Sequence, residues 1–244
     1  VLPFDVQGGE WWGEAAQAFG VPTDRLGLFQ FNGGEAARAI IMASHRRGYE
    51  AIKAAGANFP VGLTLAMLDV QAGAGGERRA AEVQHSLNDC YLEQLRGDDF
   101  VGVQTYSRLL VGPDGVLKPP PEVEQNDMGE EFYPEALGGT IRHAAQVTGA
   151  QVIVTENGLA SADDTRRLEY LRRALLCVAE CLQEGIDVRG YCVWSALDNF
   201  EWVSGYEPKF GVIAVDRRTQ ARTPKPSGEW LGQVARTNRL TTAS

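Results

Sequence analysis

A glutamate stands directly after an apolar stretch in residues 152–161, which read VIVTENGLAS. The four residues at 152–155 are apolar or β-branched, the pattern of a strand that is covered on both faces in a parallel sheet. A carboxylate in such a place is costly unless it is hydrogen-bonded or serves chemistry. Glu156 is therefore the first candidate for a catalytic residue.

Polar and aromatic side chains also end two other strand-like runs, at 99–107 and 188–198. The carboxyl ends of parallel strands converge on one face of the sheet, so these side chains should meet there. An aromatic plane fits the C–H face of a sugar ring, amides and carboxylates bind its hydroxyls, and two carboxyl groups commonly break a glycosidic bond. The set favours glycoside chemistry. Its members are Gln104, Tyr106, Glu156, Asn157, Trp194, Asp198 and Asn199.

Alternating helix-like and strand-like runs must position these residues. Amphipathic helices are predicted at 34–56, 76–97, 133–149 and 163–185, and the strands that follow them at 61–68, 99–107, 150–158 and 188–198. This order predicts an α/β protein with four βα units and a parallel sheet. A hairpin at 210–218 and a last helix at 225–238 complete the pattern, and residues 112–131 form a long loop rich in Pro, Gly and acid.

Composition excludes several classes of function. The 244 residues carry a formal net charge of -9 without a run of Lys and Arg, so neither nucleic acid nor a membrane is an expected partner. No apolar run approaches the roughly 20 residues that span a bilayer. The four cysteines show no metal or disulfide-framework spacing, and the three histidines share no ligand spacing, so we expect no metal, no cofactor and a cytoplasmic location.

Five segments resemble the second half of glycoside hydrolase family 1, the β-glucosidases and their relatives. They are DFVGVQTYSR at 99–108, MGEEFYPEAL at 128–137, VTENG at 154–158, VWSALDNFEWVSGYEPKFGVIAVD at 193–216 and RTPKPSGEW at 222–230. The resemblance covers residues 34 to about 238 and implies part of a (β/α)8 TIM barrel, with the four βα units corresponding to strands five to eight.

The same resemblance implies roles for single residues. Glu156 would be the nucleophile of a retaining mechanism, and Tyr106 would orient its carboxylate. Trp194 would stack under the sugar, Glu201 and Trp202 would bind its outer hydroxyls, and Phe210 would close the pocket wall. Gln104 and Asn157 complete the predicted substrate-binding set. At 104–106 the chain reads Gln-Thr-Tyr where the family commonly has Asn-Tyr-Tyr, which puts contacts toward the leaving group in question.

The family's Thr-x-Asn-Glu-Pro segment, which carries the general acid/base, does not occur here, and Glu35 in FNGGEAAR is read as a helix N-terminal charge. The chain is expected to begin just beyond that segment. Half a barrel exposes two sheet edges and an apolar face. A complementing half-barrel chain, a second copy of this chain, or an irregular segment at 1–33 that packs on the half barrel of 34–244 would cover them; Trp11, Trp12, Phe19, Phe29 and Phe31 make that segment apolar.

Two hypotheses follow. The first is a retaining β-glycosidase that hydrolyses β-glucosides through a glycosyl-enzyme on Glu156, either with activated leaving groups only or with a complementing N-terminal half or second subunit. The second is a non-catalytic sugar-binding or interaction module derived from this family, because a fold and its motifs do not guarantee turnover. A covalent adduct on Glu156 distinguishes the two.

Overall fold

A computed structural model describes residues 10–26, 34–56 and 58–240 of the chain. The chain divides into two compact units, which are described separately. The first comprises the described residues of 1–61, 70–94 and 110–117, and the second comprises 62–69, 95–109 and 118–240. The second unit contains every residue of the predicted site.

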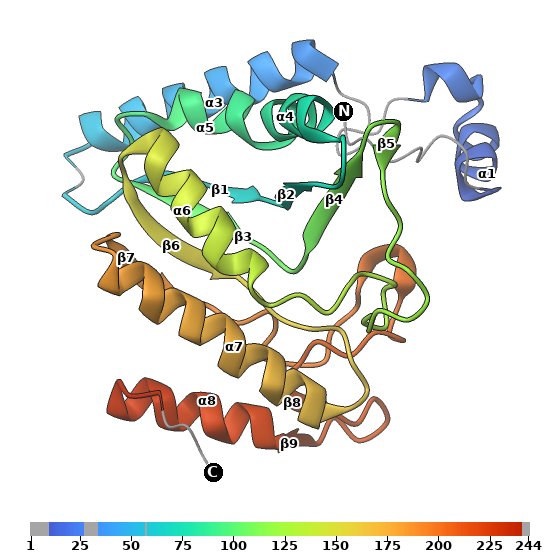
Figure 1. Ribbon diagram of the computed structural model, residues 1–244, viewed down its shortest axis with the longest axis vertical. Helices are drawn as coiled ribbons and strands as arrows, with labels where there is room; N and C mark the ends of the chain where they lie inside the picture. The colour runs from blue at the N-terminus through green and yellow to red at the C-terminus, as the bar shows by residue number, and fades with distance from the viewer. Residues whose placement is uncertain (1–9, 27–33, 57, 241–244) are drawn as a thin grey trace. The chain divides into compact units, whose positions relative to one another are not determined.

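The second unit is built on a four-stranded parallel sheet with the order β1-β3-β6-β7. Its strands are β1 (Gly62–Ala66), β3 (Phe100–Gln104), β6 (Gln151–Glu156) and β7 (Val188–Tyr191). All four fall within the predicted strand ranges, and Figure 1 shows them side by side. Val101, Val103, Val152 and Val154 are completely buried in the sheet, as the β-branched runs predict. The α/β class with a parallel sheet is confirmed.

One irregularity interrupts the pairing of β3 with β6. Val103 lies opposite Val154, but the next residue of β3, Gln104, lies opposite Glu156. Thr155 is thus an extra residue on β6, the arrangement of a β-bulge. The bulge places Glu156 across from Gln104 at the carboxyl ends of the two strands.

Of the three α-helices described in the second unit, the first two contact this sheet and the third packs against the second (Figure 1). Helix α6 (Ala136–Thr148) packs against β3 and β6, α7 (Asp164–Gln183) lies between α6 and α8, and α8 (Pro226–Thr237) follows the β8–β9 hairpin. Asp163 caps α7 by accepting a hydrogen bond from the Thr165 amide, and Pro226 starts α8 at the first helical position, where a missing N–H costs nothing. The antiparallel pair is β8 (Ile213–Val215) with β9 (Arg222–Pro224), so the predicted hairpin at 210–218 contains the first strand but not the second.

The first unit holds most of the described N-terminal helices. They are α1 (Glu10–Phe19), the 3-10 helix η2 (Thr23–Arg25), α3 (Gly34–Ala54), α4 (Glu77–Gln84), the π-helical turn η3 (His85–Asp89) and α5 (Cys90–Leu92), followed by η4 (Glu93–Leu95) at the boundary. The prediction of an irregular segment at 1–33 is wrong for residues 10–19 and 23–25, which are helical. Phe19 is 66% exposed, and Phe29 and Phe31 lie outside the described residues.

A small second sheet was not predicted. Its order is β2-β4-β5, with β2 (Asp69–Ala72), β4 (Arg108–Gly112) and β5 (Gly115–Val116). The β4–β5 hairpin turns at Gly115, whose φ of 141° is strained for other residues. The long loop of 112–131 therefore begins with an ordered hairpin, and an isolated bridge joins Gln125 to Glu131 at its end.

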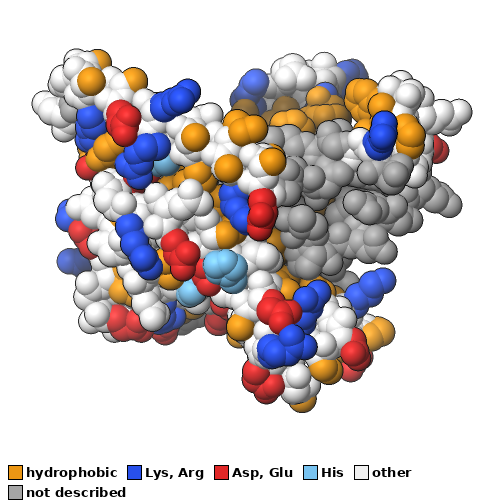
Figure 2. Space-filling model, turned by 90° about the horizontal axis from the view of Figure 1, so that it is seen from above, with side chains coloured by type: hydrophobic (Ala, Val, Ile, Leu, Met, Phe, Trp, Pro, Cys, Tyr) orange, Lys and Arg blue, Asp and Glu red, His pale blue; other side chains and the backbone are white. Residues whose placement is uncertain are grey.

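The surface carries charges of both signs. Figure 2 shows basic and acidic side chains intermingled on one face, without a field of one sign. Within the described stretches, no helix is long and apolar enough to cross a membrane.

Candidate active site

The carboxylate of Glu156 is held by two side chains from the neighbouring strand end. The Tyr106 hydroxyl donates to its Oε2 at 2.6 Å, and Gln104 Nε2 donates to its Oε1 at 3.0 Å. Each oxygen of the carboxylate thus has a donor, and all three side chains are partly accessible. The longer amide of Gln104 reaches the carboxylate, whereas Thr105 between the two donors is buried and pairs with Thr140 at 2.8 Å.

Tyr106 is a fixed donor in this arrangement. Burial, and then the hydrogen bond to Glu156 and the negative charges of Glu156 and Glu201, raise the pKa of Tyr106 far above its usual range. The phenol therefore keeps its proton at every pH at which the protein would work. The ring of Phe210, which is 5% exposed, meets the Tyr106 ring edge-on at a centroid distance of 5.9 Å and limits its movement.

A second cluster follows β7. The indole Nε1 of Trp194 points to Glu201 Oε2 at 3.4 Å, a long contact between two residues predicted to bind the sugar. Ser195 Oγ donates to the Leu197 carbonyl at 2.7 Å and also lies 3.2 Å from Asn199 Oδ1, contacts that fix the turn after Trp194. The structure thus pairs Gln104 and Tyr106 with Glu156, Phe210 with Tyr106, and Trp194 with Glu201.

Trp202 differs from the other predicted residues. It is 78% exposed and has a φ of 45°, a left-handed conformation that is unusual for a tryptophan. Sparsely populated backbone conformations of this kind concentrate at ligand-binding segments. Its predicted role in binding a sugar stays a prediction.

Asn157 has an environment that argues against its predicted contact with substrate. Its side chain is completely buried. Its Nδ2 donates to the Thr105 carbonyl at 2.7 Å and to the Tyr170 hydroxyl at 3.0 Å, while Oδ1 accepts from the Tyr191 hydroxyl at 2.8 Å. Both amide hydrogens and the oxygen are used within the protein, so Asn157 has no free group to offer a sugar.

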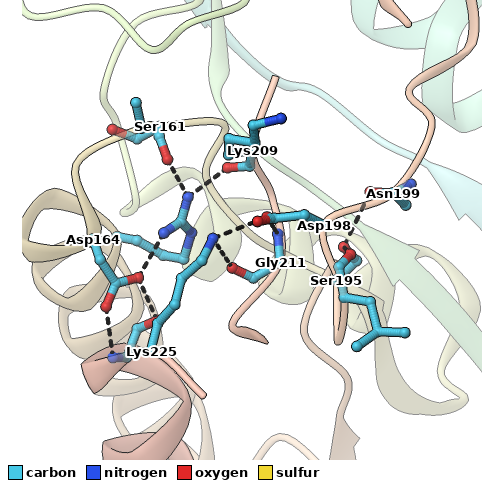
Figure 3. A network of polar contacts seen from close by, with 12 residues as sticks. Ser161, Asp164, Ser195, Asp198, Asn199, Lys209, Gly211 and Lys225 are labelled. Atoms are coloured by element: carbon cyan, nitrogen blue, oxygen red, sulfur yellow. Dashed lines mark hydrogen bonds and ion pairs between the residues drawn. The ribbon is translucent and has the colours of Figure 1, made fainter. Parts of the chain in front are cut away.

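Asp198 braces the loop after β7 (Figure 3). Its Oδ1 accepts from the Gly211 amide at 3.0 Å and from Lys225 Nζ at 2.9 Å, and the same Nζ donates to the Gly211 carbonyl at 2.7 Å. Burial lowers the pKa of Lys225, while the hydrogen bond to Asp198 acts in the opposite direction. This ion pair fixes the chain beside Phe210, and its lysine was not predicted from the sequence.

Arg167 is a second structural residue that was not predicted from the sequence. It is 1% exposed, lies on α7, and joins Asp164 Oδ1 at 2.6 Å to the carbonyls of Ser161 and Lys209. Asp164 in turn accepts from the backbone and hydroxyl of Ser227, at the N-terminus of α8. Burial opposes the ionisation of Asp164, but its hydrogen bonds from Ser227 and Arg167 outweigh burial and lower its pKa. Figure 3 shows Asp164, Ser161 and Lys209 of this group near Asp198 and Lys225.

Among the described residues, no group of three or more His, Cys, Asp or Glu side chains could hold a metal ion. The donors around Glu156 are a phenol and an amide, which suit a carboxylate rather than a cation.

Comparisons with known proteins agree with this fold. The model of glycosyl hydrolase family 1 matches residues 97–240. A 1,4-beta-D-glucan glucohydrolase of Thermotoga neapolitana is 36% identical over 166 residues, 62% of this chain and 37% of that protein. A beta-galactosidase of Sulfolobus acidocaldarius is 32% identical over 263 residues, 93% of this chain and 52% of that protein.

Solved structures agree with these relatives. The beta-glycosidase BGL167 superposes with a TM-score of 0.86 at 51% identity, over 100% of this chain and 58% of that one. The beta-glucosidase of Thermotoga maritima superposes with a TM-score of 0.76 at 27% identity, over 84% of this chain and 56% of that one. The chain therefore spans 37% to 58% of the length of these four proteins. Because the family model matches more than half of its residues, the chain belongs to glycosyl hydrolase family 1.

Proposed function

We propose that this chain is the nucleophile-bearing part of a retaining β-glycosidase that acts on β-glucosides. The observation that carries the proposal is the Glu156 carboxylate at the end of a parallel strand, with one donor on each oxygen. Relatives that are a glucan glucohydrolase, a beta-glucosidase and a beta-galactosidase support the substrate class.

For a substrate whose leaving group departs as a stable anion, the first half of the reaction needs only groups that this chain holds. A Glu156 oxygen attacks the anomeric carbon, a carbon–oxygen bond to the carboxylate forms, and the bond to the leaving group breaks, with the electron pair leaving on the glycosidic oxygen. Tyr106 and Gln104 hold the carboxylate in one orientation before the attack, which lowers the entropic part of the barrier.

The complete reaction needs a further group, which protonates the leaving oxygen in the first half and activates water in the second half. We propose that four further strands supply this group and complete a barrel, either from a longer chain or from a complementing one. β1 and β7 are the edge strands of the described four-stranded sheet, and the aligned relatives are about twice as long as this chain. A second copy of this chain is the other way to cover those edges.

Trp194, Glu201 and Phe210 would form the glycone pocket. A pyranose on the indole of Trp194 would present outer hydroxyls to Glu201, whose Oε2 already faces the indole N–H. Phe210 would exclude water beside Tyr106. These assignments follow the family resemblance and agree with the pairing of the side chains.

The test is covalent labelling of the 244-residue chain with 2,4-dinitrophenyl 2-deoxy-2-fluoro-β-glucoside. The dinitrophenolate leaves without protonation, so the reagent tests the nucleophile alone, and the fluorine slows hydrolysis of the adduct. We expect one added deoxyfluoroglucosyl group in the intact mass, on the peptide that contains Glu156, and none in Glu156→Gln. Labelling of another residue would overturn the assignment. Saturable sugar binding without an adduct would instead favour a binding module.

A further inference from the structure

A set of linked hydrogen bonds, called the circuit below, is centred on the buried side-chain amide of Asn157, the residue that follows Glu156. It joins Asn157 to Thr105, Tyr170 and Tyr191. Two of its bonds go to neighbouring elements: Nδ2 reaches the Thr105 carbonyl, one residue beyond β3, and Oδ1 receives the hydroxyl of Tyr191, the last residue of β7. The third is to Tyr170 of α7, whose own hydroxyl proton goes to the Tyr106 carbonyl at 2.6 Å. Every donor in the circuit thus has an acceptor.

The backbone of the same residue reaches the third strand end. The Trp194 amide donates to the Asn157 carbonyl at 2.8 Å. The next residue, Gly158, lies so close to Trp194 that a Cβ there would be 1.8 Å from the Trp194 carbonyl oxygen. Asn157 therefore joins the chain around Tyr106, the chain around Glu156 and the chain around Trp194.

The chemistry of the circuit requires an amide. Thr105 supplies a carbonyl and Tyr170 a hydroxyl whose proton is already used, so both need a donor from residue 157, while Tyr191 needs an acceptor. An aspartate would turn an oxygen toward the Thr105 carbonyl, and an aliphatic side chain would leave several buried polar groups unpaired. Burial raises the pKa of Tyr170 and Tyr191, so both hydroxyls keep their protons.

We propose that Asn157 and Tyr170 are positioning residues of the reaction, which set the distance between Glu156 and Tyr106 without touching the sugar. Tyr170 acts on the backbone of Tyr106, and Asn157 acts on Thr105 and Trp194, so a change in either moves the nucleophile relative to its donor. The inference rests on the proposed function and adds to it one residue, Tyr170, that α7 contributes from outside the strand ends.

The experiment compares Tyr170→Phe with Thr148→Val in the full chain. Tyr170→Phe keeps the ring that packs edge-on against Phe132 at 5.7 Å and removes only the hydroxyl. Thr148→Val removes a buried hydroxyl that bonds to the Ala144 carbonyl and the Ala150 amide before β6 begins, at the opposite end of that strand. Asn157→Ala perturbs the circuit more strongly than Tyr170→Phe. If Asn157→Ala does not fold, Tyr191→Phe replaces it as a milder change to the same circuit.

The readout is the concentration dependence of labelling by the fluoroglucoside, which separates the maximal rate of adduct formation from the reagent's half-saturating concentration. We expect Tyr170→Phe to lower the maximal rate about tenfold or more with an unchanged half-saturating concentration, because small misplacements of reacting groups are costly. Thr148→Val should leave both unchanged. Equal rates in the two variants, or a loss confined to reagent binding, would overturn the inference.

Hydrogen exchange decides the inference if the wild-type chain does not label, an outcome that counts against the proposed function. The amides of Thr105 and Trp194 donate to the carbonyls of Glu156 and Asn157, and they report the circuit directly. We expect their protection to fall in Tyr170→Phe and not in Thr148→Val. A loss of the same size in both variants would mean that the circuit does no more than stabilise the fold.

Discussion

Removing the hydroxyl of Tyr106 tests the arrangement around Glu156 most directly. Tyr106→Phe deletes the donor 2.6 Å from Oε2 and keeps the ring against Phe210. Gln104 still holds Oε1, so the carboxylate loses one of its two side-chain donors. The change is therefore confined to one hydrogen bond with a charged acceptor.

The size of the effect follows from that single bond. A hydrogen bond to a charged group contributes about 1.5–3 kcal/mol. If the bond acts by orienting the nucleophile and its loss is felt in the transition state, labelling should slow by about 10- to 150-fold, at 1.36 kcal/mol for each factor of ten. The half-saturating concentration of the reagent should change little, because the hydroxyl faces Glu156.

The assay is the time course of intact mass with the fluoroglucoside. Tyr133→Phe is the matched control, since it removes a phenol from a ring that stacks on Arg108 and not on Glu156. Labelling of Tyr106→Phe within about twofold of the control would refute the reasoning, because the bond would then contribute nothing to the reactive geometry. A large rise in the half-saturating concentration would show instead that the hydroxyl binds the sugar.

Three further predictions concern stability. Lys225→Met leaves the Asp198 carboxylate, 12% exposed, without its cation, so the free energy of unfolding in urea should fall by about 3 kcal/mol; an unchanged midpoint would contradict the buried pair. Gly158→Ala should lower the melting temperature strongly, because its Cβ would collide with the Trp194 carbonyl, whereas Gly48→Ala, with open space, should not. The pKa values of Tyr106, Tyr170 and Tyr191 are raised, so the folded state holds protons that the unfolded state releases near pH 10; stability should fall above that pH, less steeply in Tyr170→Phe, as pH-dependent urea melts would report.

The strands and the candidate nucleophile could be predicted because their cause is local. Alternating helical and β-branched runs fix the four parallel strands, and Glu156 stands out as a carboxylate behind buried valines. The small β2-β4-β5 sheet could not be found, since its short strands lack a distinctive period and depend on a turn at Gly115.

The complete burial of Asn157 was not predicted from the sequence. Its place beside Glu156 suggested a shared site, but neighbouring residues of an extended chain point to opposite sides. That alternation alone would have been enough to predict burial for one of the two. Its partner Tyr170 and the Lys225–Asp198 pair depend on contacts 13 and 27 residues apart, which no local pattern encodes.

The bulge at Thr155 separates the packing of strand β6 in the sheet from the orientation of its last residue, Glu156. In a regular strand, the side chains that fill the sheet also fix which way its last residue points, so a change in the interior would carry through to the tip. The extra residue between Val154 and Glu156 breaks that link. The valines of β6 can then vary with the packing of the sheet while Glu156 keeps its direction, and protein engineers could rebuild the interior of this strand independently of its reactive end.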